Sequence, residues 1–120
     1  MSALTGLLTE EPPYSLLAAD KTPRLLSELN ALTQHHSVAC AQYQRLLNSL
    51  PDTGYAAQST AQLPYLSVRL FKQYALQSVP DNAVFKTLYS SGTTGQPSRI
   101  VLDKDAAALQ SRVLVRIMQH

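Results

Sequence analysis

The sequence predicts an α/β fold in which a helical N-terminal half is followed by a strand, a Gly/Ser/Thr-rich loop, a second strand and a helix. Three observations support this prediction. Apolar residues recur at helical spacing between residues 23 and 50, residues 83–91 alternate in polarity, and the small-residue stretch 90–98 separates that segment from the β-branched run 98–103.

The N-terminal region predicts a lead-in followed by long helices. We expect residues 1–22 to be a flexible lead-in, with one short helix over 14–20. Thr22 followed by Pro23 is a strong helix start, because Thr caps free N–H groups and Pro is well tolerated at the first helical position. Leucines then continue at helical spacing, and Pro51 ends the pattern. The polar stretch 33–37, "TQHHS", is either a break or a continuation of the helix.

In the C-terminal half, the spacing of apolar residues changes from that of helices to that of strands. After a small-residue loop over 51–62, Ser67 is placed to cap a short helix over 70–74. Residues 83–91 and 98–103 read as two strands that flank the loop. Asp103 is placed to cap a last helix that carries an apolar face up to the end of the chain. Because two strands and an uncovered apolar helix are marginal alone, we expect residues 23–120 to be the N-terminal part of a domain that extends past residue 120.

Composition excludes several function classes. The formal net charge is +2 and the ten Lys and Arg are scattered, so nothing indicates nucleic-acid binding. The N-terminus has no basic region of a signal peptide, and no apolar run approaches the ~20 residues of a membrane span. The single cysteine, Cys40, fits a reducing compartment, so we expect a cytoplasmic protein.

The stretch "YSSGTTGQPSRIVLD", residues 89–103, is the strongest chemical signal in the sequence. A phosphate-binding loop needs glycines, so that its backbone can come close to the phosphate. It also needs N–H groups that point to one place, and hydroxyls that donate hydrogen bonds to phosphate oxygens. It is not a Walker loop, because no Lys follows the second glycine and a strand follows in place of a helix. Composition alone favours a plain turn over a phosphate loop. The residues that would bind a cofactor are Ser90, Ser91, Gly92, Thr93, Thr94, Gly95 and Ser98.

This loop resembles the phosphate-loop signature of the adenylate-forming enzymes, and more specifically that of the LuxE-type acyl-protein synthetase family. That family shows Ser-Ser-Gly-Thr-Thr-Gly, then Ser, a branched apolar stretch and Leu-Asp, as residues 90–103 do. A family-like segment upstream, with Pro, Leu, Val, Phe and Lys in order, corresponds to residues 64–72. The helical lead-in with His36 and Tyr43 is similar too, so the resemblance covers roughly residues 20–118.

The resemblance implies a ligase that uses ATP and Mg²⁺ to activate a fatty or other carboxylic acid as an acyl-adenylate. The loop would bind the β- and γ-phosphates, and the hydroxyls of Ser91, Thr93 and Thr94 would donate hydrogen bonds to them. The Lys that commonly follows the loop's proline is Ser98 here. Members of the family are several-fold longer, so their adenine pocket, Mg²⁺ ligand, catalytic Lys and acyl-accepting Cys cannot be placed in this chain. The segment would need the rest of the enzyme or a partner subunit. The alternative is a non-catalytic interaction or scaffold module in which the loop is a turn.

Other reactive residues are better explained without catalysis. Cys40 follows His36 by one helical turn, a spacing that suits a nucleophile and base, but a small buried Cys is favoured. His35 and His36 point about 100° apart on a helix, which disfavours joint metal binding. Solvated positions are favoured over binding roles for three basic residues and an acidic pair: Arg69, Lys72, Arg99, Glu10 and Glu11.

Overall fold

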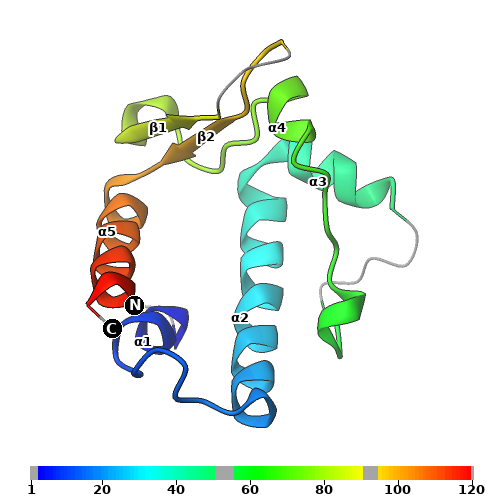
Figure 1. The fold of residues 1–120 in the computed structure, drawn as a ribbon. Helices are drawn as coiled ribbons and strands as arrows, with labels where there is room; N and C mark the ends of the chain where they lie inside the picture. The colour runs from blue at the N-terminus through cyan, green and yellow to red at the C-terminus, as the bar shows by residue number, and fades with distance from the viewer. Residues whose placement is uncertain (1–2, 51–55, 91–94, 120) are drawn as a thin grey trace.

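The computed structural model describes residues 3–50, 56–90 and 95–119 of the chain (Figure 1). The elements are α1 (Ala3–Thr9), α2 (Ala18–Ala39), α3 (Ala41–Asn48), η1 (Thr60–Gln62), α4 (Leu70–Gln73), η2 (Asp81–Ala83), β1 (Lys86–Tyr89), β2 (Arg99–Leu102) and α5 (Lys104–Met118). The predicted class, a helical N-terminal half followed by strand, loop, strand and helix, is confirmed.

The N-terminal region is more helical than its sequence suggests. Helix α1 occupies Ala3–Thr9, inside the segment expected to be a lead-in. The helix start at Pro23 is wrong, because α2 begins at Ala18 and contains the proline. Its first turn forms before the proline: the Leu17 carbonyl accepts hydrogen bonds from the N–H groups of Asp20 and Lys21, at 3.1 and 2.9 Å. Pro23 is the sixth residue of α2 and lies past its first turn, so it has no N–H to donate to the Ala19 carbonyl four residues earlier.

The polar stretch "TQHHS" continues the helix, and the break comes later, at Cys40. Its backbone is extended, with φ −125° and ψ 104°, and it separates α2 from α3. The Cys40 N–H still donates to the His36 carbonyl at 2.8 Å, while its carbonyl accepts from Gln44 at 3.0 Å. Cys40 thus pairs with a backbone group of each helix, and the two helices follow one another without a loop.

The two strands form an antiparallel hairpin with Tyr89 opposite Arg99 and Lys86 opposite Leu102. The predicted cap of the last helix is confirmed, since Asp103 Oδ1 accepts the Ala106 N–H at 2.8 Å. The predicted Ser67 cap of α4 is wrong, because the N-cap is Arg69 and no side chain caps this helix. Ser67 Oγ accepts the Arg69 N–H at 3.3 Å, just before the short α4.

Figure 1 shows α2 and α5 running in a similar direction on opposite sides of the molecule. The hairpin lies across one end of these two helices, and α1 lies at the other end. Helix α1 contacts both α2 and α5, while α4 and α5 contact β2. The Cα radius of gyration, 15.8 Å, exceeds the ~14 Å of a compact domain of this length. Large apolar side chains of α5 are exposed: Leu114, Val115, Ile117 and Met118. Among the described residues, no helix is both long and apolar enough to cross a bilayer.

A side-chain amide joins the segment after α3 to α2. Asn30 Nδ2 donates to the Ala57 carbonyl at 2.9 Å, and Asn30 Oδ1 accepts the Ala57 N–H at 3.0 Å. Ala57 is buried, so both of its backbone groups depend on this amide. The pair fixes residues 56–58 against the middle of α2.

Candidate functional site

The neck of the Gly/Ser/Thr loop is closed by two hydrogen bonds between Ser90 and Ser98. The Ser90 N–H donates to the Ser98 carbonyl at 3.0 Å, which extends the hairpin by one pair. The Ser98 N–H donates to Ser90 Oγ at 2.8 Å. Ser98 is only 3% exposed, whereas Ser90 is exposed. The two serines therefore fix the base of the loop rather than both facing a ligand.

Gly95 is the third predicted loop residue that the structure describes. Its φ of +115° lies in the region that L side chains rarely adopt, although a Cβ there would meet nothing within 4 Å. Backbone conformation, not space, requires glycine at this position. The other predicted loop residues, Ser91, Gly92, Thr93 and Thr94, lie outside the described part of the chain.

A cavity of about 330 Å³ lies beside this neck and has two cationic side chains in its wall, Lys72 of α4 and Arg99 of β2. Tyr89, the cross-strand partner of Arg99, lines it too. The remaining wall is formed by Phe71, Gln73, Tyr74, Ala75, Gln96 and Pro97. Because Gln96 and Pro97 lie between the two strands, the cavity is bounded in part by the C-terminal end of the predicted loop segment.

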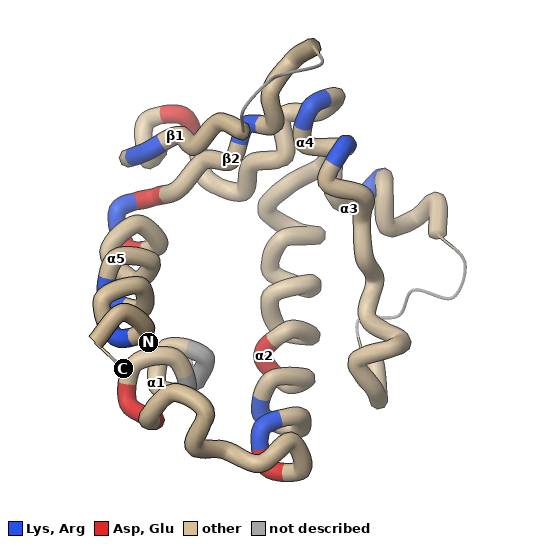
Figure 2. Tube along the Cα trace, in the orientation of Figure 1, with Lys and Arg blue, Asp and Glu red and all other residues tan. Residues whose placement is uncertain are grey.

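The charges in this cavity are uncompensated within the described residues. Among the described residues, an ion pair joins Arg24 and Glu11, far from the hairpin. In the same part of the chain, neither Lys72 nor Arg99 has a carboxylate partner. Residues 82–102 contain no Asp or Glu. In Figure 2 basic positions lie on α4 and β2, and the acidic positions that flank the hairpin in sequence are Asp81 before β1 and Asp103 after β2. The cavity therefore favours an anionic ligand.

These positions refine the sequence interpretation of the basic residues. Lys72 is half-buried and lines the cavity, so it is not simply part of a solvated face. Arg99 is exposed, as expected, yet it also reaches the cavity. Arg69 precedes α4 and remains exposed outside this wall.

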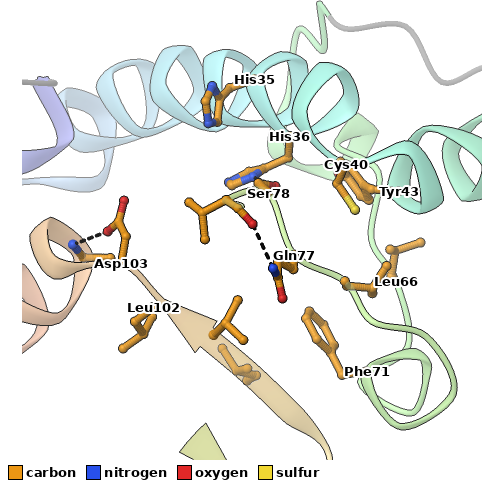
Figure 3. A pocket seen from close by; sticks show the side chains of 15 residues that line it. His35, His36, Cys40, Tyr43, Leu66, Phe71, Gln77, Ser78, Leu102 and Asp103 are labelled. Atoms are coloured by element: carbon orange, nitrogen blue, oxygen red, sulfur yellow. Dashed lines mark hydrogen bonds between the residues drawn. The ribbon is translucent and has the colours of Figure 1, made fainter. Parts of the chain in front are cut away.

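A second, larger cavity of about 450 Å³ lies between α2, α3, the segment 66–79 that contains α4, β2 and the start of α5 (Figure 3). Most of its wall is apolar, including Leu66, Leu76, Val79, Ile100 and Leu102. The titratable residues in the wall are His35, His36, Cys40, Tyr43 and Asp103. Sequence reasoning did not detect this cavity, because its walls come from segments far apart in the chain.

His36 and Ser78 meet in this cavity through a hydrogen bond of 2.6 Å between Nδ1 and Oγ. Burial lowers the pKa of His36, and the neighbouring His35 lowers it further. The two imidazole rings make an edge-to-face contact with centroids 5.0 Å apart. His36 is therefore neutral at pH 7, which fits the expected packing role better than that of a cation.

Cys40 is 5% exposed, as the interpretation of a small buried cysteine predicts, but it lies at the break between α2 and α3 rather than inside a helix. It lines the same cavity as His36. Among the described residues, no group of three or more His, Cys, Asp or Glu is arranged to hold a metal ion.

Phe71 belongs to the walls of both cavities. Its ring therefore stands at the boundary between an apolar space and a cationic one. In Figure 3 it points toward the space between Gln77 and Leu66. The arrangement suits a ligand with an apolar end and an anionic end.

The chain matches a known protein family. The sequence model described as "Acyl-protein synthetase, LuxE" matches residues 2–120. No curated protein and no solved structure matches the chain.

Proposed function

This chain belongs to the LuxE acyl-protein synthetase family, and from that membership we propose that it forms the N-terminal portion of an ATP-dependent ligase. The ligase would activate a fatty or other carboxylic acid as an acyl-adenylate. The observation that carries the proposal is the closed Ser90–Ser98 neck beside a cavity with two unpaired cations. A loop with a fixed base and an adjacent cationic wall suits the β- and γ-phosphates of a nucleotide.

The residues of this chain would act by positioning and by charge. Gly95 itself has a positive φ, while Ser90 and Ser98 are joined by hydrogen bonds at the two ends of the segment. We propose that Ser91, Thr93 and Thr94 donate hydroxyl hydrogen bonds to phosphate oxygens, together with the backbone at Gly92. Lys72 and Arg99 would stabilise the negative charge that develops on pyrophosphate as the acid's carboxylate displaces it from the α-phosphate.

Mg²⁺ accompanies ATP in such reactions, but the described residues do not suit it. Mg²⁺ prefers an octahedral set of oxygen ligands, usually carboxylates, and no acidic cluster is present in the described part of the chain. The residues near the loop are basic or neutral. Ligands for the metal, and the groups that bind adenine and ribose, would come from other parts of the enzyme.

The test is exchange of labelled pyrophosphate into ATP, dependent on a carboxylic acid, in the complete enzyme. Thr93→Ala and Thr94→Ala should each lower the exchange rate, whereas Thr22→Ala, an exposed threonine in α2, should not. Undiminished exchange in both loop variants would refute the phosphate assignment of the loop.

The cationic wall has its own comparison within the same assay. Lys72→Met and Arg99→Met should raise the KM for ATP or lower kcat, because each removes a charge beside the loop. Lys86→Met is the matched control, since Lys86 lies exposed at the other end of the hairpin. Equal behaviour of all three variants would remove the cavity from the proposed site.

The exposed apolar residues of α5 favour a second candidate, a non-catalytic module that docks on a partner. In that case the loop is a turn and binds no nucleotide. Measurable Mg²⁺-ATP affinity of the chain, lost in Thr93→Ala, would favour the ligase instead.

A further inference from the structure

A third cavity, of about 430 Å³, lies where the end of α1 meets α5. Figure 1 shows this junction at the opposite end of the molecule from the hairpin. The wall is formed by Thr9, the last residue of α1, and by Ser111, Arg112, Val115 and Arg116 of α5. Two of these side chains are cationic and none is anionic, so the cavity favours a negatively charged occupant.

The guanidinium of Arg116 is only partly satisfied. Its Nη2 donates to the Glu11 carbonyl at 2.9 Å, which joins the segment after α1 to α5. Its Nε is buried and has no hydrogen-bond partner among the described residues. A buried N–H without an acceptor is costly, and in a native protein such a group commonly binds an ion or a water molecule. The side chain that lines the cavity therefore lacks an acceptor.

Arg112 increases this need for an anion. It precedes Arg116 by one helical turn, and like charges at that spacing destabilise a helix. Arg112 and Ser111 are exposed, and in the described part of the chain neither has a hydrogen-bond or ion-pair partner. The C-terminal end of α5 carries only about half a negative charge, which two guanidinium groups outweigh. An anion between the two arginines would remove their repulsion.

The acidic side chains closest in sequence to this cavity are engaged elsewhere. Glu11 Oε1 accepts a hydrogen bond from Arg24 at 3.2 Å. Glu10 lies over α1, where a Cβ added at Gly6 would be 3.4 Å from its Oε2. Neither carboxylate is part of the cavity wall. In Figure 2 these acidic positions follow α1, while basic positions lie along α5. The described residues thus leave the two arginines of the wall without a carboxylate.

The donors in the wall suit a phosphate group. Guanidinium groups bind phosphate through paired hydrogen bonds, and a tetrahedral phosphate can accept from several directions at once. Ser111 offers a hydroxyl donor, whereas Thr9 Oγ1 already donates to the Thr5 carbonyl at 2.6 Å. The volume is that of a small-molecule pocket rather than of a single ion, and Val115 supplies an apolar surface. The ligand that fits is a phosphate carried by a small organic group.

We propose that the cavity between α1 and α5 binds a small organic phosphomonoester. Arg112 and Arg116 hold its phosphate group, and the Ser111 hydroxyl donates a further hydrogen bond. Because Arg116 also holds the segment after α1, the bound ligand stabilises the packing of α1 against α5. The site is separate from the nucleotide site proposed at the hairpin and does not rest on it.

The experiment titrates the full chain with glycerol 3-phosphate at constant ionic strength and records the NMR signals of the arginine Nε–H groups. The signals of Arg112 and Arg116 should shift and saturate with a single dissociation constant. Inorganic phosphate should bind at the same groups, no more tightly than the ester. An Arg116 Nε–H signal that does not move would overturn the proposal, since water would then satisfy this group. Equally tight binding of acetate, or binding of inorganic phosphate without the ester, would also overturn it.

Three variants make the test specific. Arg112→Gln, at an exposed position, and Arg116→Lys, which keeps the charge but not the fork, should each weaken binding about tenfold or more. Lys104→Gln removes the same charge as Arg112→Gln from the start of α5, about 12 Å away along the helix axis. Because that distance exceeds the Debye length of ~10 Å at 0.1 M salt, its effect should stay below about twofold. Equal weakening by Lys104→Gln and Arg112→Gln, or none in both arginine variants, would contradict the site.

The result can be separated from that of the proposed function. Arg99→Met removes a charge from the cavity at the hairpin and should leave the dissociation constant measured at Arg116 unchanged. Loss of the Arg116 shift in Arg99→Met would overturn the proposal of a separate site. Loss of acid-dependent pyrophosphate exchange in Thr93→Ala, with phosphate binding at Arg116 retained, would support both sites.

Discussion

Removing one hydroxyl at the neck of the loop should loosen a single, identifiable amide. In Ser90→Ala the Ser98 N–H loses its acceptor, Ser90 Oγ at 2.8 Å, while Ser98 stays almost fully buried. A buried donor left without a partner costs about 1–3 kcal/mol. At ~1.4 kcal/mol per factor of ten, hydrogen exchange of the Ser98 amide should accelerate about 5- to 150-fold.

The same measurement contains its controls. The other neck bond, from the Ser90 N–H to the Ser98 carbonyl, is unaffected, so amides within β1 should change much less. Ser90→Thr keeps the oxygen and should preserve protection. Ser15→Ala removes an exposed hydroxyl that donates to the Pro12 carbonyl. It should change the free energy of unfolding by no more than about 0.5 kcal/mol.

The reasoning would be refuted in either of two ways. Exchange at Ser98 that is unchanged in Ser90→Ala would show that the hydroxyl does not hold the neck. Equal acceleration in Ser90→Thr would show that volume, not the hydrogen bond, is what matters at this position.

Three further predictions concern stability, measured by urea denaturation followed by circular dichroism. Asp103→Ala removes the cap of α5 and should lower the free energy of unfolding by about 1 kcal/mol, whereas Asp103→Asn should retain most of it. Asn30→Ala leaves both buried backbone groups of Ala57 unpaired and should cost about 2 kcal/mol; a change below 0.5 kcal/mol (about the error of the method) would contradict this contact. Because burial lowers the pKa of His36 from its ordinary 6.5, the native state binds fewer protons than the unfolded state below that pH. Stability should therefore decline as the pH falls from 6.5 toward the lowered pKa, and His36→Gln, but not His35→Gln, should abolish that decline.

Much of the C-terminal half follows from local rules. Alternating polarity predicts the first strand and a β-branched run predicts the second, and the two strands pair as an antiparallel hairpin. Asp103 caps the last helix because a short acidic side chain before a helical pattern satisfies a free N–H. Gly95 adopts a positive φ that other residues rarely reach.

The N-terminal helices show where local rules fail. Thr22 and Pro23 form a good start signal, but the helix begins earlier, since Leu17 already provides the first carbonyl. Conversely, "TQHHS" contains no helix breaker and stays helical, and the bend comes at Cys40, which carries no breaking signal in the sequence. At the start of α2 and at Cys40, contacts with the rest of the fold override the weak local preference of the sequence for or against a helix.

The sequence by itself determined the Gly/Ser/Thr-rich stretch, the strands around it and the family resemblance, because these depend on residues within a few positions of one another. Only the tertiary structure decided what surrounds the loop. The cationic wall joins Lys72 to Arg99, and the apolar cavity pairs His36 with Ser78, 42 residues later in the chain. Such contacts arise when distant elements pack together to remove surface from water, and no local pattern specifies which residues will then meet.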